Sequence, residues 1–220
     1  MSIGFILLIL TGALVLFGAG QRALDRLRLT DRQALLFIAL ILAGGFLPDI
    51  PVTERFSFNV GGALIPLILC GYLWAKAGTA VERVRCLLAA LVTGVAVFTI
   101  GRLLPDEPEA MPFDVNYLYG VAAGAVGWLF GRSRRGAFIA GTLGVMLANV
   151  ASAATVWAQG VDQRLTLGGA GGYDVIVISG LLAVLLCELF GEIAERVVRG
   201  NRSPEHGLRN GEFIRREARR

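Results

Sequence analysis

Apolar residues are grouped along the chain in long runs that alternate with short polar segments. Seven such runs span residues 3–20, 33–47, 60–76, 86–104, 116–131, 137–158 and 173–194. A helix that crosses the hydrocarbon of a bilayer takes roughly 20 apolar residues, and most of these runs approach that length. The pattern predicts an all-α membrane protein, built as a seven-transmembrane-helix bundle.

The polar segments differ in charge, and every second one is rich in arginine. The basic segments are 21–32, 76–85, 131–136 and the tail, whereas "PDEPEAMPFD" at 105–114 has no basic residue. Because basic loops stay in the cytoplasm, this alternation predicts an odd number of spans, with the N-terminus outside and the C-terminus in the cytoplasm. We expect a single transmembrane domain over 1–198 and a basic cytoplasmic tail over 199–220.

Composition supports the same class and excludes several others. Of 220 residues, 55% are hydrophobic and 17% are charged, which leaves no room for a separate soluble domain. The arginines are scattered among loops, so no nucleic-acid partner is expected; the basic tail either touches anionic lipid or is merely solvated. Cys70, Cys86 and Cys187 lack metal-ligand spacing, and neither a metal site nor a cofactor is expected.

Two polar segments that lead into spans share one residue pattern. "RFSFNVGGA" from Arg55 and "RLTLGGAGG" from Arg164 both read Arg, apolar, hydroxyl, apolar, and then a Gly-Gly-Ala motif, and they start 109 residues apart. The repeat indicates a 3+1+3 parallel duplication of the spans. "RFSF" and "RLTL" alternate like short strands, so we predict that they pair as an outer cap, antiparallel if a two-fold axis relates the halves. The alternative is two similar re-entry loops.

The glycines of these two segments, with two polar neighbours, are the candidate binding site. Glycine permits sharp turns and exposes backbone amides, and Asp174 stands at the head of the last apolar run. A carboxylate there either caps its own helix or faces a wet cavity as a functional group. The predicted site for a small solute or ion consists of Asn59, Gly61, Gly62, Gly168, Gly169, Gly171, Gly172 and Asp174.

Three blocks of the sequence are similar to those of a known family. "NVGGALIPL" at 59–67, "GTLGVMLA" at 141–148 and "GGAGGYDVIVISGLLAVLL" at 168–186 resemble signature blocks of a prokaryotic membrane protein family catalogued as domain of unknown function sixteen-fourteen. The resemblance runs from about Gly44 to Leu186. It implies a multi-pass protein of the prokaryotic cytoplasmic (inner) membrane and supports the choice of Asp174, but it implies no reaction.

The chain also departs from that family pattern. Val175 stands where the family has Gly after the aspartate, and Asn149 and Val150 follow the second block where the family carries an Asp. In "GGFLPDIP", Asp49 occupies a position where the family has Asn. These departures weaken any mechanism that needs a pair of aspartates.

The favoured interpretation is a non-enzymatic membrane protein that binds or transports a small solute or ion. One alternative is an intramembrane aspartyl-type hydrolase centred on Asp174, which would need a second carboxylate within about 5 Å for the two to share a proton. Another is a membrane scaffold or assembly factor that works through its tail. No catalytic residue and no metal ligand is assigned, and the oligomeric state is left open.

Overall fold

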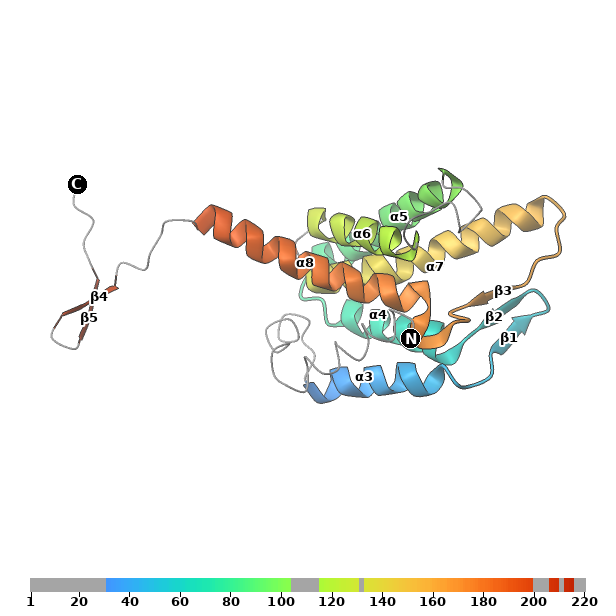
Figure 1. Cartoon of the computed structure of the whole chain (residues 1–220), viewed down its shortest axis with the longest axis horizontal. Helices are drawn as coiled ribbons and strands as arrows, with labels where there is room; N and C mark the ends of the chain where they lie inside the picture. Colours follow the sequence, from blue (N-terminus) through green and yellow to red (C-terminus); the bar gives the residue numbers. More distant parts are fainter. Residues whose placement is uncertain (1–30, 104–114, 131–132, 200–205, 210–211, 216–220) are drawn as a thin grey trace.

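The computed structural model describes residues 31–103, 115–130, 133–199, 206–209 and 212–215. This part of the chain is mostly helical, with one small sheet and one hairpin (Figure 1). In chain order the elements are α3 (Asp31–Gly44), β1 (Ile50–Thr53), β2 (Phe56–Phe58), π-helix η1 (Val60–Leu64), α4 (Ile65–Ala75), α5 (Ala80–Leu103), α6 (Val115–Leu129), α7 (Arg134–Ala158), β3 (Leu165–Leu167), 3-10 helix η3 (Gly171–Tyr173), α8 (Val175–Arg199), β4 (His206–Arg209) and β5 (Glu212–Arg215).

Six of the seven expected helices fall within these described residues, and all six positions are helical. The first expected span, 3–20, lies outside them. Two helices, α5 with 24 residues and α7 with 25, are long and apolar enough to cross a membrane; at 1.5 Å per residue each extends for more than about 35 Å. The other described helices have shorter apolar stretches, so the number of membrane spans stays a prediction.

The helices pack closely because small residues line their contacts. α7 lies at the centre and contacts α4, α5, α6 and α8. A side-chain carbon on Gly127 of α6 would lie 2.5 Å from Ala137 Cα of α7, and one on Gly141 would lie 2.7 Å from the Ser179 carbonyl oxygen of α8. Glycine at these positions therefore lets backbones meet at distances that any side chain would prevent.

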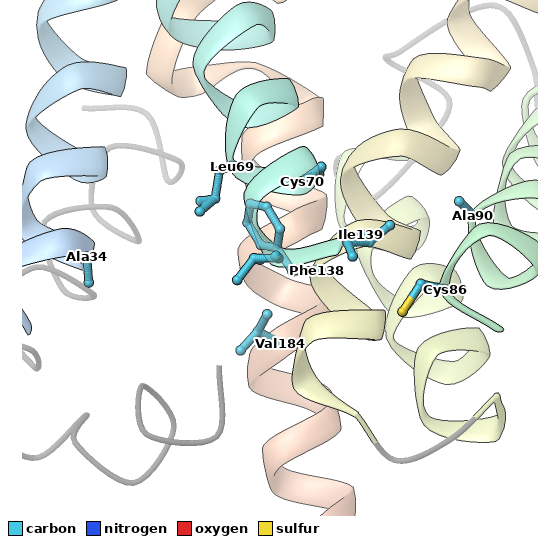
Figure 2. Close-up of a cluster of buried hydrophobic side chains, with 9 residues drawn as sticks. Ala34, Leu69, Cys70, Cys86, Ala90, Phe138, Ile139 and Val184 are labelled. Atoms are coloured by element: carbon cyan, nitrogen blue, oxygen red, sulfur yellow. The ribbon is translucent and has the colours of Figure 1, made fainter. Parts of the chain in front are cut away.

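The main hydrophobic cluster draws on five helices (Figure 2). Leu69, Cys70 and Leu73 of α4 contact a group of side chains from the neighbouring helices, namely Ala34, Cys86, Ala90, Phe138, Ile139 and Val184. The three cysteines of the chain are buried and free, in keeping with their expected role as small apolar residues.

The sheet confirms one sequence prediction and corrects another. Its strand order is β1-β2-β3, so "RFSF" and "RLTL" do pair. They run parallel, however, with Phe56 opposite Leu165 and Phe58 opposite Leu167, and the antiparallel prediction is wrong. In a parallel ladder, one strand is related to the next by a translation, so opposite edges of the two strands pair. A two-fold axis would instead bring the same edge of each strand together. The pairing therefore lacks the symmetry expected of a two-fold repeat.

Two further elements were not expected from the pattern. β1 pairs antiparallel with β2 and has an irregular register between Pro51 and Thr53; proline is tolerated there because β1 is an edge strand. In the tail, β4 and β5 form an antiparallel hairpin in which His206 pairs with Arg215.

Candidate functional site

Bare backbone from three parts of the chain meets where the sheet joins the helices. A side-chain carbon on Gly44 would lie 2.8 Å from Gly61 N, and one on Gly171 would lie 2.9 Å from Gly45 Cα. One on Gly62 would overlap the carbonyl of Gly168. We call Gly44, Gly45, Gly61, Gly62, Gly168 and Gly171 the glycine junction. It joins the end of α3, the start of η1 and the turn after β3, and none of these contacts leaves room for a side chain.

The junction contains most of the glycines predicted for the site. Gly61, Gly62, Gly168 and Gly171 belong to it, and Gly172 N lies 3.3 Å from the position of a carbon added to Gly45. Gly169 does not belong to it, because it is exposed and an added carbon would meet only Thr166. Gly168 and Gly171 have positive φ angles of 73° and 61°, which glycine adopts without strain.

Sequence reasoning missed the third side of the junction. Gly44 and Gly45 end α3, directly before "FLPDIP", and they are the partners of Gly61 and Gly171. The available signal was a third Gly-Gly pair at a helix boundary. It was overlooked because a glycine pair after a helix is ordinarily explained by the helix ending.

Asn59 is buried at the start of η1 and connects four segments. Its side-chain Oδ1 accepts a hydrogen bond from the Gly62 N–H at 2.9 Å, and its Nδ2 donates to Asp49 Oδ1 at 2.9 Å. Its backbone N–H donates to the Leu167 carbonyl at 2.8 Å, and its carbonyl accepts from Leu64 N–H, the bond that makes this turn a π-helix. Asp49, which stands where the family pattern has Asn, is thus a partner of Asn59.

Asp174 precedes α8 and caps it. Oδ1 accepts a hydrogen bond from the Ile176 N–H at 3.0 Å, and Oδ2 accepts one from the Ala170 N–H at 3.3 Å. The pKa of the carboxyl is raised above its ordinary value, because burial disfavours the charged form more than these two amides favour it. The carboxylate therefore holds the glycine turn against the first turn of α8.

A short polar ladder connects the two segments that share a sequence pattern. Ser57 Oγ and Thr166 Oγ1 are hydrogen bonded at 2.8 Å, and the Leu165 N–H donates to the Arg55 carbonyl at 2.9 Å. Arg55 also pairs with Asp162 at 2.8 Å, but both side chains are more than half exposed, so this pair contributes little. Equivalent positions of the two patterns therefore contact each other directly.

Charged side chains gather where α5 and α7 begin, at the end of α7 away from β3. Arg134 is buried and pairs with Glu188 of α8, and Arg135 pairs with Glu82 of α5 at 3.1 Å. We call Glu82, Arg85, Arg134, Arg135 and Glu188 the arginine layer. Its two ion pairs tie α7 to α8 and to α5, and removing one member of a buried pair leaves the other charge uncompensated.

From sequence, the arginines of this layer are interpreted only as charges of the basic segments 76–85 and 131–136. The available signal was Glu188, an acid one helical turn inside an apolar run, because such a residue needs a partner. Within the described residues, no group of three or more His, Cys, Asp or Glu side chains is placed to hold a metal ion.

A family model described as "Protein of unknown function (DUF1614)" matches residues 28–186. The chain belongs to this family, as its sequence blocks predicted, and the match covers the glycine junction, Asn59, Asp174 and most of the arginine layer. No curated protein and no solved structure matches the chain.

Proposed function

We propose that the protein is a multi-pass protein of a prokaryotic cytoplasmic membrane and that its helix bundle binds and passes a small solute or ion. In this proposal the N-terminus and the glycine junction face outward, and the arginine layer and the C-terminus face the cytoplasm. The basic segments 76–85 and 131–136, which lead into α5 and α7, support this orientation, since basic residues are retained on the cytoplasmic side.

The exposed side of α5 supports the placement of this helix in a membrane. A run of large apolar side chains on this 24-residue helix is exposed, and exposed apolar patches of this kind mark contact with lipid or with another protein. The exposed residues are Val81, Val84, Leu87, Leu88, Leu91, Val92 and Val95.

One observation supports the proposed passage of a solute or ion: two helices with irregular starts converge. η1 leads into α4 and η3 leads into α8, and the two starts meet through Gly62 and Gly168. Interrupted helices of this kind form the binding sites of many transporters, because their free backbone groups can bind a ligand at membrane depth. Separation of these two glycines would expose the amides that Asn59 and Asp174 now occupy.

Flux into proteoliposomes tests this proposal. We would reconstitute the purified full chain and follow proton entry with an internal pH-sensitive dye, and sodium entry with radioactive sodium, under an imposed potential. We expect flux of one of these ions in the wild type and its loss in Asp174→Asn. Asp162→Asn is the matched control, because it removes a carboxylate that is exposed and that, among the described residues, pairs with Arg55. Flux no greater than that of empty liposomes for both ions would contradict ion passage.

The hydrolase alternative gains no support from the contacts of Asp174. Both of its side-chain hydrogen bonds within the described residues are accepted from backbone amides. Asp49 accepts a side-chain hydrogen bond from Asn59. Shared-proton chemistry requires two carboxyl groups in direct contact, and these contacts provide none.

A further inference from the structure

A cavity of about 240 Å³ lies beside the arginine layer, and two members of the layer, Glu82 and Arg85, line it. The first turns of α5 and α7 and the end of α6 surround it. Its polar lining includes Glu82, Arg85 and Ser133, and its apolar lining includes Val81 and Phe130. It is therefore a mixed site, with charge on one side and apolar surface on the other, and it lies far along the chain from Asp174.

The acidic residue of the cavity is already neutralised. Glu82 Oε1 pairs with Arg135 at 3.1 Å and accepts a hydrogen bond from Ser133 Oγ at 3.5 Å. Its Oε2 accepts the Gly78 N–H at 3.0 Å. Arg135 in turn donates to the Lys76 carbonyl at 2.7 Å. Both charges of this pair are thus committed to contacts within the protein.

Arg85 is the charge that the cavity leaves uncompensated. It lines the cavity, its side chain is exposed, and it makes no hydrogen bond or ion pair with any residue that the structure describes. The starts of two long helices add to its field, since α5 and α7 both direct the positive ends of their peptide dipoles toward this space. The net potential in the cavity therefore favours an anion.

The surface next to Arg85 indicates what carries that anion. Val84 directly precedes Arg85 on α5, and Leu88, Leu91 and Val95 come after it at intervals of three or four residues; all four are exposed. They form a continuous apolar strip on one side of the helix. A ligand with an anionic head in the cavity could lay hydrocarbon chains along this strip.

We propose that the cavity binds a phosphoryl group, carried by an anionic phospholipid of the cytoplasmic leaflet, with Arg85 as the charged contact. Guanidinium groups bind phosphate oxygens through paired hydrogen bonds. The apolar strip of α5 selects a lipid over a soluble phosphate ester. This inference rests on the membrane placement proposed above, but not on the passage of a solute or ion.

Native mass spectrometry of the purified full chain tests the proposal. The protein would be released from a neutral detergent in the presence of phosphatidylglycerol, of phosphatidylcholine, or of inorganic phosphate alone. We expect the wild type to retain phosphatidylglycerol in preference to phosphatidylcholine. Arg85→Gln should lower that retention at least about tenfold, because a hydrogen-bonded charge is lost. This variant removes no contact within the described protein, so its fold should be intact.

Arg83→Gln is the matched control. It removes the same charge two residues away on the same helix, where the guanidinium lies over the Trp74 ring and outside the cavity lining. Retention that falls only in Arg85→Gln supports the lipid site. Retention of inorganic phosphate in place of the lipid, with the same dependence on Arg85, would overturn the lipid as the source. Equal loss in both variants, or loss in neither, would overturn the site itself.

Discussion

The two ends of the bundle are held together by opposite means. At the glycine junction, α3, η1 and the turn after β3 meet as bare backbone, and a side chain added at five of its six glycines would collide with a neighbouring segment. At the arginine layer, α5, α7 and α8 are joined by charged side chains, and a cavity of about 240 Å³ remains between helices. Backbone contact fixes one arrangement, whereas long side chains can exchange partners. The comparison indicates a rigid end and an adaptable end.

The largest expected effect comes from adding one carbon to the glycine junction. Gly62→Ala would place its Cβ against the Gly168 carbonyl, and neither backbone segment can give way without breaking the β2–β3 pairing. We expect a loss of about 3 kcal/mol in the free energy of unfolding, measured by thermal unfolding in detergent together with the yield of folded protein.

Gly71→Ala is the control for that substitution. Gly71 lies in α4, and an added carbon would meet nothing within 4 Å. Replacing a helical glycine by alanine should raise stability by up to about 1 kcal/mol. Equal stability of the two variants would show that the junction is not held by close backbone contact.

Breaking the arginine layer should have the next largest effect. Arg134→Ala leaves Glu188 without its partner, and we expect a loss of about 2 kcal/mol, reduced from the fully buried case because Glu188 is one quarter exposed. The double variant Arg134→Met with Glu188→Leu should recover most of that stability. If the double variant were as unstable as the single one, the two charges would not act as a pair.

The ladder between the two repeated patterns should contribute less. Ser57→Ala and Thr166→Val each remove one partner of the hydroxyl hydrogen bond, and each should lower stability by about 1 kcal/mol. The double variant should lose little more than either one, because the same bond is removed. Full additivity in this double-mutant cycle would show that the two hydroxyls are not coupled.

The smallest effect concerns pH. Burial raises the pKa of Asp174, so the folded state favours the protonated carboxyl, and the stability from this group is lost as pH rises from about 4 through the raised value. Asp174→Asn keeps the oxygen that accepts the Ile176 amide. Relative to this variant, the wild type should therefore lose less than about 1 kcal/mol between pH 4 and pH 8. The prediction would be contradicted if the wild type, compared with Asp174→Asn, were more stable at pH 8 than at pH 4.

Local pattern was sufficient to predict the helices and part of the junction. The apolar runs matched the helices of the described residues with end points that differ by at most six positions, because helix formation here follows continuous hydrophobicity. The shared pattern at Arg55 and Arg164 predicted the pairing of β2 with β3. It also selected Asn59 and four of the six junction glycines.

Long-range geometry accounts for what the sequence did not reveal. Whether β2 and β3 run parallel or antiparallel depends on how the helices that follow them are placed. The residue pattern of the two strands does not encode this. Gly44 and Gly45 join the junction through the position of α3, and Arg134 meets Glu188 across two helices. Whether Asp174 serves only as a cap could not be decided from a carboxylate beside a glycine turn, since both roles require that placement.

Hydrogen exchange of the full chain in lipid nanodiscs would test the contrast between the two ends most directly. We would compare amides of the glycine junction, in peptides that cover 58–64 and 166–176, with amides around the cavity, in peptides that cover 76–86 and 133–137. We expect the junction amides to exchange at least about tenfold more slowly, because their exchange requires η1 and the β3 turn to separate. Equal exchange at both ends, or faster exchange at the junction, would contradict a rigid end closed by backbone contact.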